Sequence, residues 1–342
     1  GLLAMGGVFD IGSLGAYLLY VKQVSQPVSQ ISQQVNTILA AIAGAERIFA
    51  VMEAQPEEDE GQTTIVRVEK NGDTLTEVPQ RTGHWAWKKP DGSLTELRGD
   101  VRFDHVTFGY DPDKVVLHDI SLFAEPGQKI AFVGSTGAGK TTITNLINRF
   151  YEVSGGSITY DGMDVRLIKK NDLRRSLGVV LQDTHLFTGT VADNIRFGKL
   201  DATQEEIERA ARIANADSFI RRLPQGYNTM VTSDGANLSQ GQRQLLAIAR
   251  AAVADPPVLI LDDPFSALDR HTEDTVFANL QEYAKDKVVF LISHRLYHFP
   301  QMRSVIFMED GKATVGTHGE LMASVPVYRQ LYESQTGGQT HE

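Results

Sequence analysis

The residues best suited to chemistry form a glycine-rich run that ends in a lysine and a threonine. The run fits the pattern G-x-x-x-x-G-K-[ST] and consists of Gly134, Ser135, Thr136, Gly137, Ala138, Gly139, Lys140 and Thr141. Glycines let the backbone curl so that successive N–H groups point at an anion, and a helix that begins behind the loop adds the positive end of its dipole. In such a loop Lys140 can reach the β- and γ-phosphates of a nucleotide, and the Thr141 hydroxyl can ligate Mg²⁺.

The segments on either side of this run are the ones that a phosphate-binding loop needs. Residues 129–133 (Lys-Ile-Ala-Phe-Val) are typical of a strand, and a helical run is predicted from Thr142 to Phe150. A glycine-rich turn with a chance lysine would need neither flank. The sequence therefore predicts a site for a nucleoside triphosphate, and we include Thr142 among the residues that contact it.

A second candidate is a pair of aspartates at the end of a short apolar strand. Residues 258–261 (Val-Leu-Ile-Leu) are followed by Asp262 and Asp263. At a strand end beside a phosphate loop, Asp262 can hold Mg²⁺ through water. Two adjacent aspartates could instead cap a loop, or form a two-carboxylate metal site of the nuclease type. The phosphate loop in the same domain favours the magnesium role.

A third candidate is the sequence Leu-Ser-Gln-Gly-Gln at 238–242, which precedes a predicted helix from Arg243 to Ala254. Ser239 is suited to cap that helix, and Gly241 permits close approach of the backbone to a ligand. The start of the helix is a second anion site, and Gln242 is part of it. A capped helix alone would be unremarkable.

The elements that must position these residues alternate between strands and helices. A strand pattern at 101–108 is followed by short apolar runs at 178–181, 258–261 and 288–292, with longer helical runs between them. Continuous apolar runs of this length suit a parallel sheet that is buried on both faces. Residues 193–254 are mostly helical, which predicts a separate helical lobe within an α/β fold.

Composition excludes some classes of partner and site. The chain of 342 residues has a net charge of −10 and no basic stripe, which argues against nucleic acid as a partner. With 0 cysteines it can form neither a disulfide framework nor a thiolate metal site, which fits a cytoplasmic location. The chain begins at Gly1 rather than at a methionine, so we expect a C-terminal fragment of a longer protein.

The N-terminal segment up to Val21 is almost wholly apolar and near the length of a membrane span. Asp10 would be costly at the centre of a bilayer, so we expect the end of one span, a turn that starts near Gly6, and a second span from about Ile11. Beyond Lys22 apolar residues recur every three or four positions, which predicts a continuing helix. No basic region precedes the apolar stretch, which disfavours a signal peptide. An amphipathic helix of a soluble protein is the alternative.

A linker without evident chemistry follows this helix. The helical pattern stops at Gln55-Pro56, and the acidic run after it indicates a boundary. Asn71-Gly72 between alternating segments predicts a β-hairpin. Trp85 and Trp87 are expected to be packing anchors rather than a platform for a ligand. The predicted regions are thus residues 1–54, 55–100, 101–335 and 336–342.

In this order and spacing, the phosphate loop, the Leu-Ser-Gln-Gly-Gln segment and the Leu261-Asp262 strand end resemble the nucleotide-binding domain of ABC transporters. The resemblance covers roughly residues 101–335 and implies an α/β P-loop ATPase domain, with a helical subdomain at about 184–254. The N-terminal helix, which ends in Ala-Glu-Arg-Ile-Phe at 45–49, is similar to the last membrane helix and its cytoplasmic extension, an all-α transmembrane remnant. The implied cofactors are ATP and Mg²⁺.

The same resemblance implies roles for further residues. Tyr110 looks like the aromatic residue that stacks on adenine, and Gln182 like the glutamine that senses Mg²⁺ and the membrane domain. Residues 266–269 (Ser-Ala-Leu-Asp) look like the loop that crosses the dimer interface. His294 resembles the switch histidine that contacts the γ-phosphate, whereas an isolated histidine at a strand end would carry no such meaning. The implied sets are Asp263, His294 and Gln182 for catalysis, and Thr141, Gln182 and Asp262 for the metal.

One residue departs from the pattern of an active ABC site. In the family, the aspartate at the end of this strand, called the Walker B aspartate and represented here by Asp262, is followed by a glutamate. This chain has Asp263 instead, followed by Pro264-Phe265. Aspartate is one methylene shorter, so its carboxylate falls short of the attacking water by about 1.5 Å. A general base contributes roughly 10²–10⁴-fold to a rate, and misplacement forfeits much of this. The resemblance is therefore to the degenerate-site subunit of a bacterial heterodimeric exporter of the multidrug-like type.

The resemblance implies an exporter because residues 182–195 look like the segment whose helical lobe docks on the coupling helices of the membrane domain. We expect a multi-pass protein of the cell membrane with its ATPase domain on the cytoplasmic side, a second half-transporter as partner, and a small molecule or lipid as substrate. The intact segment at 238–242 would complete the partner's site. Three alternatives remain open: a homodimeric exporter in which aspartate suffices, a soluble ABC-type ATPase switch, and a module that binds ATP without hydrolysing it. The linker at 55–100 is longer than usual, and the family implies no role for it.

Overall fold

The computed structural model describes residues 11–336 and divides into two compact units, Gly1–Glu58 and Asp59–Glu342. The described part of the first unit consists mainly of one helix, α2 (Ile11–Met52). This helix is the first element of the described residues and contains the segment predicted as the second span. The predicted end of a first span and the turn before Ile11 lie outside the described residues.

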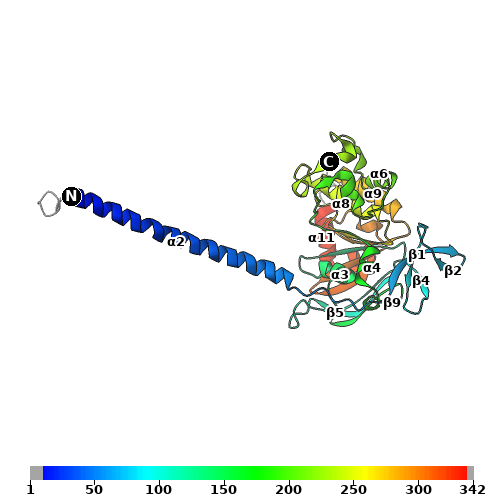
Figure 1. Cartoon of the computed structure of the whole chain (residues 1–342). Helices are drawn as coiled ribbons and strands as arrows, with labels where there is room; N and C mark the ends of the chain where they lie inside the picture. Colours follow the sequence, from blue (N-terminus) through cyan, green and yellow to red (C-terminus); the bar gives the residue numbers. More distant parts are fainter. Residues whose placement is uncertain (1–10, 337–342) are drawn as a thin grey trace. The chain divides into compact units, whose positions relative to one another are not determined.

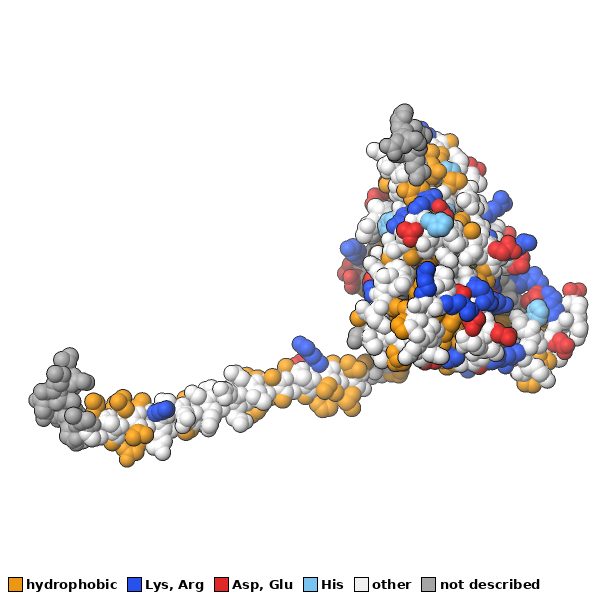
Figure 2. Space-filling model, turned by 90° about the horizontal axis from the view of Figure 1, so that it is seen from above, with side chains coloured by type: hydrophobic (Ala, Val, Ile, Leu, Met, Phe, Trp, Pro, Cys, Tyr) orange, Lys and Arg blue, Asp and Glu red, His pale blue; other side chains and the backbone are white. Residues whose placement is uncertain are grey.

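Helix α2 combines apolar and uncharged polar side chains along its length. Its charged residues are Lys22, Glu46 and Arg47, and Figure 2 shows mostly hydrophobic and uncharged side chains between them. Pro27 lies inside the helix, and the Ser25 hydroxyl donates to the carbonyl of the residue four positions earlier at 2.7 Å. The helix is long and apolar enough to cross a membrane.

A six-stranded sheet in the order β10-β13-β14-β7-β15-β16 forms the centre of the second unit, and of these strands β16 alone is antiparallel. Its strands are β7 (Lys129–Gly134), β10 (Leu177–Val180), β13 (Val258–Asp262), β14 (Val288–Ile292), β15 (Ser304–Glu309) and β16 (Lys312–Gly316). Every residue of β13 and β14 is buried, because their continuous apolar sequences are covered on both faces. Since β14 lies between β13 and β7, the carboxyl ends of these three parallel strands meet at one edge.

An antiparallel sheet in the order β6-β5-β8-β9 shares a buried core with the central sheet. Its strands are β5 (Val101–Phe108), β6 (Leu117–Ala124), β8 (Gly155–Tyr160) and β9 (Met163–Asp164). Phe103 of β5, Phe132 of β7 and Ile143 of helix α3 (Lys140–Ile147) belong to the same buried cluster. Both the strand before the phosphate loop and the helix after it are therefore held by packing.

Helices gather at the end of this unit that lies opposite β5 and β9 in Figure 1. The lobe contains α5 (Val191–Arg196), α6 (Gln204–Ile213), α7 (Asp217–Ile220) and α8 (Gln240–Val253), with the short strands β11 (Gly189–Thr190) and β12 (Met230–Val231). Thr190, Thr203 and Ser239 each begin a helix with a capping box, which satisfies backbone N–H groups at the first turn. Because Ser239 is the cap, α8 starts at Gln240, earlier than the predicted start at Arg243.

The remaining helices cover the central sheet or follow its last strands. They are α4 (Lys170–Arg175), α9 (Arg270–Tyr283), α10 (His318–Ser324) and α11 (Pro326–Thr336). Short 3-10 turns lie at Val165–Leu167, Gly226–Asn228, Ser233–Gly235 and Phe299–Gln301.

The segment between α2 and β5 folds as a small sheet in the order β2-β1-β3-β4, with strands β1 (Thr64–Asn71), β2 (Thr74–Glu77), β3 (Trp85–Lys88) and β4 (Leu94–Glu96). The predicted hairpin is present, with Asn71 paired to Thr74. Trp87 is fully buried, and its indole N–H donates to the Asp161 carboxylate at 2.9 Å. The same carboxylate accepts the backbone N–H of Gly99 at 2.9 Å. Trp87 is therefore an anchor that joins the small sheet to the rest of the unit.

Replacing Trp87 by alanine should weaken this attachment. The change removes a fully buried ring and takes the indole donor away from Asp161, whose pKa burial already raises. We expect the free energy of unfolding to fall by about 3–5 kcal/mol, as for other buried tryptophans, and urea unfolding measures this loss. Trp85→Ala is the matched control, because Trp85 is only partly buried and should cost clearly less. Equal losses for the two variants would contradict the anchoring role.

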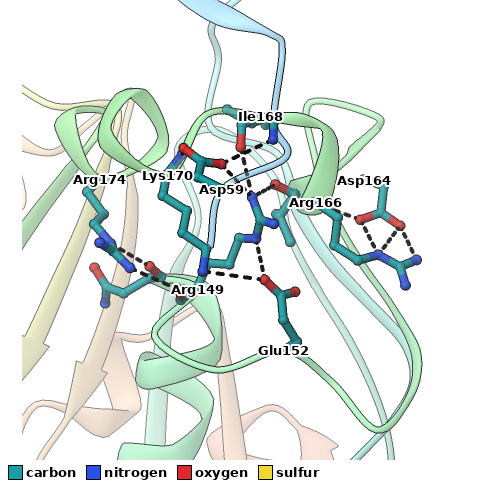
Figure 3. A network of polar contacts seen from close by, with 11 residues as sticks. Asp59, Arg149, Glu152, Asp164, Arg166, Ile168, Lys170 and Arg174 are labelled. Carbon is teal, nitrogen blue, oxygen red and sulfur yellow. Dashed lines mark hydrogen bonds and ion pairs between the residues drawn. The ribbon is translucent and has the colours of Figure 1, made fainter. Parts of the chain in front are cut away.

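A buried arginine fixes the start of the unit. Arg149, just after α3, has a left-handed φ of 51°, and its guanidinium donates to the carbonyls of Val165 at 3.3 Å and Ile168 at 2.9 Å. The same guanidinium lies 3.6 Å from one oxygen of Asp59, whose other oxygen accepts the Lys170 N–H at 2.9 Å. Figure 3 shows the side chains of Asp59 and Arg149 close to Ile168. The chain is therefore tied down at Asp59, ahead of the small sheet.

Candidate nucleotide site

The phosphate loop connects β7 to α3 and folds around its own lysine. The Lys140 ammonium donates to the carbonyls of Gly134 and Ser135, at 2.8 Å in each case. Burial lowers the pKa of Lys140, while Asp262 and Asp263 act in the opposite direction. A buried ammonium beside the open end of a loop is suited to bind phosphate oxygens, which form charge-assisted hydrogen bonds.

Two glycines of the loop are required by their geometry. Gly139 has a φ of 103°, and a Cβ at this position would lie 2.5 Å from a methyl carbon of Leu117. Gly137 has a φ of 84° in open space at the exposed tip, which also contains Ser135 and Thr136. Ala138, by contrast, is buried under the loop, which places the backbone of the tip on the outside.

The loop leaves backbone donors for a ligand. In the described chain no side chain caps α3, whose N-cap is Gly139. The first N–H groups of a helix lack partners within the helix, so an anion can accept them and also benefits from the helix dipole. Together with Lys140, these donors fit the phosphates of a nucleotide.

Thr141 and Asp262 lie together at the carboxyl end of β13. The pKa of Asp262 is raised, first by burial and then by the neighbouring charge of Asp263. Lys140, His294 and a hydrogen bond with Thr141 oppose the shift. A divalent cation would stabilise the ionised carboxylate in the same way, and hydroxyl and carboxylate oxygens are the ligands that Mg²⁺ prefers. The donor set therefore fits Mg²⁺.

Asp263 follows β13 with an unusual backbone. It is buried, with a φ of 45°, and its N–H donates to the Ile292 carbonyl of β14 at 2.8 Å. Among residues other than glycine, aspartate and asparagine adopt this left-handed conformation most readily. The bond to β14 holds Asp263 next to the strand from which His294 emerges.

His294 completes the group at this edge. It follows β14, is exposed, and lies near enough to Asp262 to lower the pKa of that carboxyl. The structure therefore brings together four predicted pieces: the phosphate loop, Asp262, Asp263 and His294. They meet because β13, β14 and β7 are adjacent and parallel.

Tyr110 lies beside the helix that follows the loop. Its hydroxyl is 3.1 Å from that of Thr142 and accepts from the Asn145 amide at 3.2 Å. Its ring meets those of Phe108 and Tyr151 edge to face and is 47% exposed. An exposed aromatic face next to the phosphate loop is suited to stack on a base.

Gln182 and the start of α8 lie around a second region. Gln182 is exposed and lines an open cavity of about 450 Å³ together with Gln240 and Gln244 of α8. Ser239 and Gln242 bond to each other through their capping box. Within residues 11–336, neither makes a hydrogen bond to the phosphate loop. The described hydrogen bonds of Ser239 and Gln242 thus belong to the start of α8 itself.

Gln244 is a site residue that the sequence did not reveal. Its buried amide donates to the Asp263 carbonyl at 3.0 Å and to the Ser266 hydroxyl at 3.1 Å, and accepts the Ala267 N–H at 3.0 Å. These bonds fix the loop after Asp263 on α8, where Gly241 also approaches it closely. The sequence could have indicated Gln244 only as a polar residue at a helix position that is expected to be buried.

Comparisons with known proteins agree with this geometry. The family model described as ABC transporter matches residues 117–266. The chain is 40% identical over 336 residues to the uncharacterized ABC transporter ATP-binding protein YfiC of Bacillus subtilis, and 39% identical over 332 residues to the fatty acid ABC transporter ATP-binding/permease protein of Mycobacterium tuberculosis. These alignments cover 98% and 97% of this chain, but 51% and 48% of the relatives. The chain spans about half the length of the curated relatives it matches.

A solved structure described as a bacterial Atm1-family ABC exporter with ATP bound has the same fold. It superposes with a TM-score of 0.72 at 31% sequence identity, covering 95% of this chain and 52% of the other. The range of the family model, residues 117–266, includes the phosphate loop, the strand that ends at Asp262, and the helical lobe. This chain therefore contains an ABC-type ATP-binding domain, an α/β P-loop ATPase domain preceded by one long helix.

Proposed function

We propose that this chain is the ATPase part of a membrane exporter, in which closure of two nucleotide domains around ATP switches the membrane domain between inward and outward access. The observation that carries the proposal is the convergence of Lys140, Asp262 and His294 at the carboxyl ends of adjacent parallel strands. Transfer of a phosphoryl group to water depends mainly on positioning and on neutralising charge, which these side chains can supply.

Each residue of the site has a role in this proposal. Lys140 and the first N–H groups of α3 hold the phosphates, and the exposed ring of Tyr110 stacks on the base. Thr141 and Asp262 hold Mg²⁺, which when bound neutralises phosphate charge, and Gln182, which follows the strand next to β13, responds to it in this proposal. His294 contacts the γ-phosphate and thereby distinguishes ATP from ADP. The full predicted set is Gly134, Ser135, Thr136, Gly137, Ala138, Gly139 and Thr142 for the phosphates.

A second ABC subunit completes the assembly in this proposal. Ser239, Gly241 and Gln242 lie at the start of a capped helix whose N–H groups can bind an anion. They act on the nucleotide held by the partner's phosphate loop. The loop at 266–269, fixed by Gln244, runs along the same interface.

Asp263 makes this chain's own site the weaker of the two. Its side chain is one methylene shorter than the glutamate of an active site, and its left-handed backbone favours aspartate over glutamate. This supports a heterodimer in which hydrolysis takes place mainly at the partner's site. The alternative is a homodimer in which aspartate is sufficient.

The helical lobe offers a surface for the membrane domain. Phe187 and Phe197 are 49% and 56% exposed, with ring centroids 4.4 Å apart, and the Arg250 guanidinium lies over both. Exposed aromatic rings of this kind are typical of interfaces. Coupling helices of the membrane domain dock on this surface in our proposal, beside the cavity lined by Gln182.

A reconstituted transporter tests the proposal. The relative from Mycobacterium tuberculosis is described as a fatty acid transporter, so we propose an amphipathic lipid as the first substrate to examine. The full-length transporter in liposomes should hydrolyse ATP with Mg²⁺ and move a fluorescent fatty acid across the bilayer, and Lys140→Ala should abolish both activities. An ATPase that does not associate with membranes would favour the soluble switch instead. Nucleotide binding without turnover at either site would favour a binding module.

A further inference from the structure

The loop that carries His294 is held from outside by a single side-chain amide. The Gln335 amide donates to the His294 carbonyl at 2.8 Å, and its oxygen accepts the Leu296 N–H at 3.0 Å. The two bonds lie on either side of Arg295, so one planar group fixes the backbone of three consecutive residues. A loop bound in this way has little freedom to rotate its peptide groups.

Arg295, which lies between His294 and Leu296, connects the same loop to the loop that follows Asp263. Its guanidinium donates to the Leu268 carbonyl at 3.0 Å and to the Ser266 carbonyl at 3.1 Å. It also donates to the fully buried Glu273 at 2.6 Å, which fixes the guanidinium from behind. The two loops are therefore joined through one side chain, and a displacement of either is passed to the other.

Gln335 is itself held in place by the packing of α11. Tyr328 of this helix is fully buried, and its hydroxyl lies 2.7 Å from the His318 ring nitrogen. Tyr328 and Gln335 are two turns apart and so lie on the same face of the helix. The tyrosine packs against Phe307 of β15, the strand next to β7. The position of Gln335, and with it that of the His294 loop, is therefore fixed relative to the central sheet by α11.

We propose that Gln335 is a positioning residue for His294, and that the C-terminal helix thereby sets the geometry of the γ-phosphate contact. The inference deepens the proposed function and rests on its assignment of His294 to the γ-phosphate. Gln335 touches only the backbone of the loop, so its effect reaches the nucleotide through His294. A purely structural role, as the end of a packed helix, would not distinguish ATP from ADP.

ATP retention in the full-length transporter tests this proposal. Radiolabelled ATP that remains bound after rapid removal of free nucleotide is compared with the equilibrium affinity for ADP. Gln335→Ala should reduce the retained ATP about tenfold, as expected for the loss of two hydrogen bonds, and leave ADP affinity unchanged. Gln335→Glu keeps the acceptor for Leu296 but sets a carboxylate oxygen against the His294 carbonyl, so it should lose at least as much retained ATP as Gln335→Ala. Glu333→Ala, at an exposed position of the same helix, should match the unmodified protein.

Comparison with His294→Ala separates the two levels of the proposal. If His294→Ala loses ATP retention and Gln335→Ala does not, the positioning role of Gln335 is wrong and the proposed function stands. If His294→Ala retains ATP normally, the assignment of this histidine to the γ-phosphate fails first. A Gln335→Ala protein that loses ATP and ADP alike has a general defect, and this outcome also overturns the positioning role.

Discussion

Replacing Asp263 by glutamate is expected to raise the rate of ATP hydrolysis at this chain's own site by about 10²-fold or more, within the range that a well-placed general base contributes. The added methylene moves the carboxylate outward by about 1.5 Å, toward the position of an attacking water. The left-handed backbone at this residue opposes the change, because glutamate adopts it at a cost of about 1 kcal/mol. We therefore expect a faster but slightly less stable enzyme.

The measurement is the steady-state Mg-ATPase activity of the full-length transporter. Each site is disabled in turn by replacing the lysine of its phosphate loop. Asp263→Asn is the matched control, since it keeps the length of the side chain but removes the base. Near-zero turnover that glutamate restores would support the heterodimer with one weak site. If the unmodified chain alone turns over at an ordinary rate and glutamate changes nothing, the weak-site proposal is wrong and a competent homodimer takes its place.

Lys140→Ala should weaken ATP binding by about 10²–10⁴-fold. The ammonium can make two charge-assisted hydrogen bonds to phosphate oxygens, each worth roughly 1.5–3 kcal/mol. In the structure it already lies at the centre of the loop, held by two carbonyls at 2.8 Å, so little reorganisation is needed for it to contact a ligand. Isothermal titration with ATP and Mg²⁺ measures the loss.

Lys285→Ala is the control for this variant. Lys285 is exposed and precedes β14, so it lies at the amino ends of the strands, away from the phosphate loop. Its removal changes the net charge by the same amount and should leave ATP affinity unchanged. Equal losses for the two lysines would mean that net charge, rather than the loop, determines the affinity.

The parts of the site that could be predicted are those with a local signal. The run from Gly134 to Thr141 has a fixed spacing, the strand before Asp262 is continuously apolar, and Ser239 has the residue type of a cap. Each depends on neighbours in the chain, so its sequence pattern survives whatever the tertiary fold. Boundaries were less certain: α3 begins at Lys140 rather than at Thr142, because a left-handed glycine precedes it.

The parts that could not be predicted depend on contacts between distant segments. Gln244, Arg295 and Gln335 bond to loops from other elements, and such bonds leave no periodic pattern in the sequence. The same holds for the small sheet, where Asn71-Gly72 indicated one hairpin only. The pairings of β3 with β1 and β4 include Trp87, and this residue is anchored by Asp161, which is 74 positions later in the chain.

The folded segment between α2 and β5 also has a mechanical consequence. As an unstructured chain, residues 53–100 would have a typical end-to-end distance of about 35–40 Å and would absorb most of any displacement. Because the chain is already fastened at Asp59, the link after α2 is limited to residues 53–58, about 20 Å at full stretch. A short link becomes taut early, so in the proposed exporter a movement of the ATPase domain would reach the helix with little of it lost as slack.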